Sequence, residues 1–90
     1  MQSFTCVIND PLGIHARPAG LLAKEAKSLA DVTISVTKGD KTAKASQLMK
    51  LMGLGVKKGD EITISAEGGD EAAAIEAMKT FFKDNFAAQL

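Results

Sequence analysis

The sequence has 90 residues, of which 46% are hydrophobic and 24% charged, so a single folded domain over residues 1–90 is expected rather than a disordered chain. Eleven basic residues balance eleven acidic ones and the only aromatic residues are four Phe, so neither a nucleic acid nor a membrane surface is an expected partner. No signal peptide opens the chain and no stretch approaches the roughly 18 apolar residues of a membrane span, so we expect a cytoplasmic protein.

The chain begins with a predicted strand and a predicted helix. Residues 4–8 alternate in polarity and place Cys6, the single cysteine, on an apolar face, where we expect a buried structural thiol rather than a redox group. Apolar residues then recur at spacings of three and four over residues 18–29, which predicts an amphipathic helix that starts near Ala16.

A hairpin and a short helix are predicted next. Residues 32–36 alternate cleanly, a turn follows, and residues 42–45 return as a weaker strand. Ser46 stands where its hydroxyl would cap a short helix that runs through Met52.

The last third of the chain predicts a fourth strand over residues 61–66 and a final helix capped near Asp70. The apolar stripe of this helix is formed by Ala74, Ile75, Met78, Phe81 and Phe82. We expect the chain to fray after Asn85, with packing of Phe86 onto the sheet or helix edge as the alternative. The order βαββαβα predicts an α+β fold in two layers, with helices covering one face of the sheet.

His15, the only histidine, stands where the first helix begins. Pro18 in the first turn has no N–H, so the N–H groups of Ala16 and Arg17 are the free donors at this helix end. The helix end adds about half a positive charge, and the Arg17 guanidinium can hold two phosphate oxygens. This arrangement favours a histidine that accepts a phosphoryl group, while a plain surface histidine or helix cap is the alternative. One histidine and one buried cysteine are too few for a metal site, and we expect no cofactor.

Nearly the whole chain resembles HPr, the histidine-containing phosphocarrier of the bacterial phosphoenolpyruvate-dependent sugar phosphotransferase system. The resemblance rests on residues 13–19 (GIHARPA), 46–55 (SQLMKLMGLG) and 59–68 (GDEITISAEG). It implies an open-faced β-sandwich, in which a four-stranded antiparallel sheet is covered on one face by three helices. It also implies that Enzyme I phosphorylates Nδ1 of His15, that Arg17 stabilises the phosphate, and that IIA components of sugar permeases receive the phosphoryl group. The protein would then be a carrier rather than a stand-alone enzyme.

The resemblance also implies a partner-binding surface on the short helix, here called the short-helix patch and formed by Leu48, Met49 and Met52. Methionine at helical spacing would by itself favour burial, and Leu51 is the core candidate of this helix. In many Gram-positive members an ATP-dependent HPr kinase phosphorylates a serine just before this helix. Counting back from residues 48–52 puts Gln47 at that position, so phosphorylation of Ser46 is left as an open alternative.

Other functions fit the same sequence. A carrier in the nitrogen-related branch of the system would share the chemistry and differ in its partners. A regulator without phosphoryl transfer would use the short-helix patch to bind a transcriptional regulator or an enzyme, and an interaction domain with no phosphate chemistry is a third alternative. Because fast transfer favours transient contacts, we expect a monomer.

Overall fold

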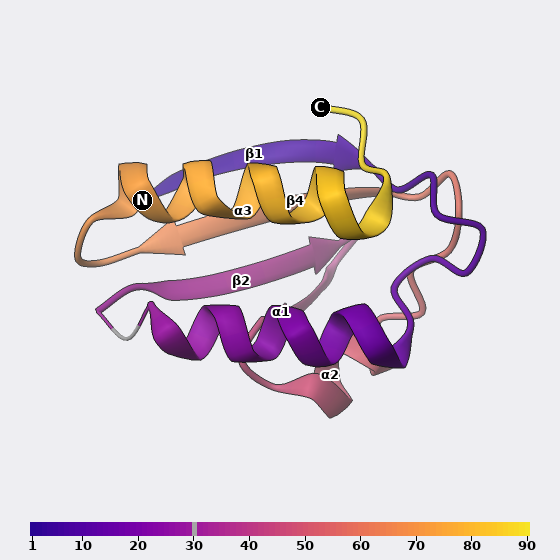
Figure 1. Cartoon of the computed structure of the whole chain (residues 1–90), viewed down its shortest axis with the longest axis horizontal. Helices are drawn as coiled ribbons and strands as arrows, with labels where there is room; N and C mark the ends of the chain where they lie inside the picture. The colour runs from indigo at the N-terminus through magenta and orange to yellow at the C-terminus, as the bar shows by residue number, and fades with distance from the viewer. Residues whose placement is uncertain (30) are drawn as a thin grey trace.

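The computed structural model describes residues 1–29 and 31–90 (Figure 1). Its elements are β1 (Gln2–Val7), α1 (Ala16–Ser28), β2 (Thr33–Lys38), β3 (Lys41–Lys44), α2 (Leu48–Gly53), β4 (Glu61–Glu67) and α3 (Glu71–Phe86). The predicted βαββαβα order is confirmed, with shifts of a few residues at the ends of the elements. None of the helices in these described ranges is long and apolar enough to cross a membrane.

The four strands form one antiparallel sheet in the order β1-β4-β2-β3. Residue Ile64 of the central strand β4 pairs with Phe4 on one side and Val36 on the other, which keeps apolar residues on the same face across three strands. Helices α1 and α3 lie over that face (Figure 1). The opposite face carries hydroxyl side chains, including the paired Thr5 and Thr63, whose Oγ1 atoms are 3.3 Å apart. The open-faced sandwich is therefore confirmed.

The core lies between the sheet and the helices because each strand alternates and each long helix has one apolar face. Leu22 of α1 and Phe82 of α3 are fully buried there, while Phe81, predicted as part of the apolar stripe, is only half-buried. Cys6 is buried as predicted, and burial raises the pKa of its thiol to about 11.

The prediction that the chain frays after Asn85 is wrong. Phe86 is fully buried as the last residue of α3, and Ala87 then takes the left-handed conformation (φ 50°) that ends the helix. The chain turns back so that Val7 and Gln89 exchange two backbone hydrogen bonds of 2.9 Å each. Burial of Phe86 together with this pairing anchors the C-terminal segment against the end of β1.

The predicted cap of α2 is also wrong by one residue. Pairing of the hairpin continues to Ala45, whose N–H donates to the carbonyl of Ile34, and a turn then joins Gln47 N to Lys44 O at 3.0 Å. The helix therefore begins after Gln47, whose side chain makes no capping hydrogen bond, and Ser46 lies outside it.

Candidate functional site

His15 is the N-cap residue of α1, with an extended backbone (φ −119°, ψ 170°). Its carbonyl accepts the first helical hydrogen bond, from the N–H of Ala19 at 3.0 Å. Because Pro18 has no N–H, the backbone donors that the first turn can offer to an anion are those of Ala16 and Arg17. The imidazole is thus attached to the residue at which the positive end of the helix dipole is strongest.

The site is open to solvent. The His15 side chain is 32% exposed, and both Ala16 and Arg17 are exposed. Among the ion pairs of residues 1–29 and 31–90, none involves Arg17, so its guanidinium is not committed to a carboxylate there. An anion carried by the histidine would meet two kinds of accessible donor, the backbone N–H groups of the first turn and the Arg17 guanidinium.

Asp10 faces the imidazole, which the sequence did not predict. Its Oδ2 lies 3.6 Å from His15 Nε2, and its Oδ1 accepts a 2.9 Å hydrogen bond from the N–H of Leu12. The backbone of Asp10 is held as well, because its carbonyl accepts from Gly13 N at 2.8 Å and its N–H donates to Phe86 O at 3.1 Å. An Asp followed by Pro signals a turn in the sequence, but the direction of the second carboxylate oxygen depends on how the turn folds.

Gly13 allows the histidine loop to lie directly against another segment. It is buried with a φ of +64°, and a Cβ added to it would be 2.2 Å from the carbonyl oxygen of Val56. The next residue, Ile14, donates its N–H to the same oxygen at 3.2 Å. The residue before His15 is therefore positioned by a carbonyl that follows α2.

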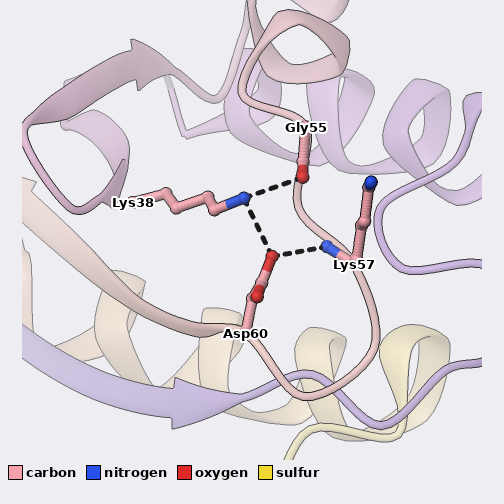
Figure 2. A network of polar contacts seen from close by, with 4 residues as sticks. All are labelled: Lys38, Gly55, Lys57 and Asp60. Atoms are coloured by element: carbon pink, nitrogen blue, oxygen red, sulfur yellow. Dashed lines mark hydrogen bonds and ion pairs between the residues drawn. The ribbon is translucent and has the colours of Figure 1, made fainter.

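A polar network fixes the segment that contains Val56, residues 55–60, here called the 55–60 loop (Figure 2). The Lys38 ammonium lies 2.9 Å from both the Gly55 carbonyl oxygen and Asp60 Oδ2, and the same carboxylate oxygen accepts from Lys57 N at 2.8 Å. Hydrogen bonds from the Lys38 side chain and then from the Lys57 backbone lower the pKa of Asp60. The end of the β2–β3 hairpin thus holds the loop on which Gly13 rests.

The short-helix patch is only partly exposed. Met49 is 81% exposed and Met52 is 38% exposed, whereas Leu48 is half-buried against the core and Leu51 is fully buried, as predicted. Burial of Leu48 follows from its place in the first turn of α2, a helix that contacts α1 and β3. The exposed apolar part of this helix therefore consists of two flexible thioether side chains.

Two further apolar side chains are exposed that the sequence does not single out, one in the loop before His15 and one on α1. Leu12 in the preceding loop is 70% exposed, and Leu21 in the second turn of α1 is 50% exposed. Nothing in the sequence distinguishes these two leucines, because a single exposed leucine is common on protein surfaces.

Ser46, the alternative modification site, is half-buried and lines a shallow depression with Lys27 and Lys44. In the described part of the chain, no cluster of three or more His, Cys, Asp or Glu residues could hold a metal ion.

Comparison with known proteins identifies relatives over almost the full length. A family model described as "PTS HPr component phosphorylation site" matches residues 2–84. The phosphocarrier protein HPr of Mycoplasma genitalium is 40% identical over 85 residues, which cover 94% of this chain and 97% of that protein. The HPr of Lysinibacillus sphaericus is 41% identical over 88 residues, covering 98% of this chain and 97% of the relative.

Solved structures give the same result. A histidine-containing phosphocarrier protein of Mycoplasma superposes with a TM-score of 0.92 at 37% identity, covering 99% of this chain and 100% of the other. HPr of Thermoanaerobacter tengcongensis superposes with a TM-score of 0.87 at 37% identity, with 100% coverage of both chains.

Proposed function

Because the chain belongs to the HPr family of the phosphotransferase system, we propose that it accepts a phosphoryl group from phospho-Enzyme I on His15 and passes it to IIA components of sugar permeases. The observation that carries this proposal is the position of His15 as the N-cap of α1 beside the exposed Arg17. Both reactions would take place in the cytoplasm.

The geometry supports transfer through electrostatics. A lone pair of the neutral imidazole attacks phosphorus, a phosphorus–nitrogen bond forms, and the bond between phosphorus and the donor group of Enzyme I breaks. The N–H groups of Ala16 and Arg17 and the Arg17 guanidinium would then hold the phosphoryl oxygens. Transfer to a IIA component reverses these steps, since the carrier only has to hold the group between two partners.

We assign partner docking to the exposed apolar side chains of the short-helix patch. Met49 and Met52 lie on α2, which packs against α1, and thioethers adapt to surfaces of different shape.

Regulation through Ser46 is a separate prediction, and the half-buried position of that residue would oppose access by a kinase. Mass spectrometry after incubation with HPr kinase and ATP tests it.

The direct test combines the chain with phosphoenolpyruvate, Mg²⁺ and Enzyme I and follows phosphorus by NMR. We expect an acid-labile phosphohistidine signal, no signal for His15→Ala, and slower phosphorylation for Arg17→Ala. Lys24→Ala, which removes an exposed cation about two turns further along the same helix, is the matched control and should slow the first transfer less.

HPr of Mycoplasma genitalium serves as the positive control for the Enzyme I preparation. A preparation that phosphorylates this relative but leaves the present chain unmodified would contradict the proposal, as would phosphorylation of the His15→Ala variant.

A further inference from the structure

The His15–Asp10 pair has a defined geometry because Asp10 is held at three other atoms. Its Oδ1 is occupied by Leu12 N, its carbonyl by Gly13 N and its N–H by the carbonyl of Phe86. Only Oδ2 is left to face the imidazole, and the atom it faces is Nε2. The carboxylate therefore has little freedom to turn away from the ring.

A carboxylate in this position discriminates between the two neutral forms of an imidazole. One form has a proton on Nε2 and a lone pair on Nδ1, and the other has the reverse. The separation of 3.6 Å is longer than a direct hydrogen bond, but the negative charge still attracts an N–H dipole at Nε2 and repels a lone pair there. The side chains of His15 and Asp10 are 32% and 22% exposed, so the attraction acts through a medium that is partly protein and partly water.

We propose that Asp10 is a positioning residue that keeps the imidazole proton of His15 on Nε2 and leaves the lone pair on Nδ1, the nitrogen on which the resemblance to HPr implies phosphorylation. This inference rests on the proposed function and adds to it a residue that determines which nitrogen reacts. The nucleophile then has no proton to lose before it attacks phosphorus.

The substitution Asp10→Asn inverts the effect of this residue. Leu12 N–H selects the amide oxygen as its acceptor, so the amide NH₂ takes the place of Oδ2 and faces His15. A donor opposite Nε2 favours a lone pair there and moves the proton to Nδ1. The substitution Asp10→Ala removes both effects, so the tautomer preference should lie between that of the wild type and that of the Asn variant.

The test is ¹⁵N NMR of the histidine-labelled protein, without phosphate, at about pH 9, well above the range in which imidazoles ordinarily titrate. We expect the Nε2–H form to dominate in the wild type and the Nδ1–H form to increase from Asp10→Ala to Asp10→Asn. The rate of phosphorylation by Enzyme I should fall with the fraction of the competent form, by about tenfold where that fraction reaches about one tenth.

The NMR measurement does not depend on phosphoryl transfer, so the two proposals fail separately. A wild-type protein that is mainly Nδ1–H overturns the inference without any variant, and so do identical spectra for wild type and a folded Asp10→Asn. If the tautomers shift as expected but His15 never carries phosphate, the positioning role stands and the carrier function fails.

Discussion

Substitution of Gly13 by Ala tests whether the histidine loop depends on its contact with the 55–60 loop. A left-handed backbone costs a residue with a Cβ about 1–2 kcal/mol, and Gly13 has a φ of +64°. The new Cβ would also lie 2.2 Å from Val56 O and 2.7 Å from Lys57 Cα, and both distances are shorter than 3.0 Å, below which Cβ contacts are essentially never found in proteins. Relief of this overlap requires backbone movement and costs about 1–3 kcal/mol more. We expect Gly13→Ala to lower the free energy of unfolding by about 2–5 kcal/mol.

The matched control is Gly55→Ala, because Gly55 has a φ of +68° and a Cβ added there would have no atom within 4 Å. Urea unfolding of both variants separates the backbone cost, which they share, from the overlap, which only Gly13→Ala has. A domain of this size loses about 4–8 °C in melting temperature per kcal/mol, so the Gly13 variant should melt at least about 8 °C below the wild type. Equal destabilisation by the two substitutions would refute the reasoning.

Three further predictions concern groups outside the histidine loop. The pKa of Cys6 is raised to about 11, which means that the folded state favours the neutral thiol. The contribution of this thiol to the free energy of unfolding should be complete below about pH 9 and decline as the pH rises toward 11. The urea midpoint should therefore decline more across this range in the wild type than in Cys6→Ala. Since the pKa of Asp60 is lowered in the folded state, its carboxylate contributes to stability above the ordinary pKa of about 3.9, and this contribution is lost as the pH falls through the folded value. Lys38→Met removes the partner of Asp60, so it should be less stable than the wild type at neutral pH and lose less stability on acidification. Parallel curves of stability against pH for the two proteins would contradict this. Phe86→Ala should cost about 3–5 kcal/mol by calorimetry, clearly more than Phe81→Ala, because only the first of these rings is fully buried.

Much of the fold was predictable because its signals are local. Alternation in residues 61–66 is enough to define β4, and the apolar spacing after Pro18 is enough to define α1. The position of His15 at the helix start follows from the same spacing and from a proline that fits the first turn. These features require no knowledge of which segments pack together.

The features that were missed depend on contacts between distant segments. One of the hydrogen bonds that hold Asp10 opposite His15 joins its N–H to the carbonyl of Phe86, which belongs to the opposite end of the chain. The sequence favours a fraying tail after Asn85 and offers the packing of Phe86, which the structure confirms, only as an alternative, since nothing local indicates that Gln89 pairs with Val7. The capping preference of a hydroxyl predicts Ser46 as the cap of α2, whereas the register of the hairpin makes Gln47 the N-cap residue and starts the helix at Leu48.

The strand order leaves β1 and β3 at the two margins of the sheet, where unpaired backbone groups invite pairing with another molecule. At the β1 margin, the bridge to Gln89 occupies the end of the strand. At the opposite margin, β3 has only four residues and carries Lys41 and Lys44 at its ends. A short, positively charged edge is a poor template for edge-to-edge pairing, so neither margin favours extension of the sheet into a second molecule.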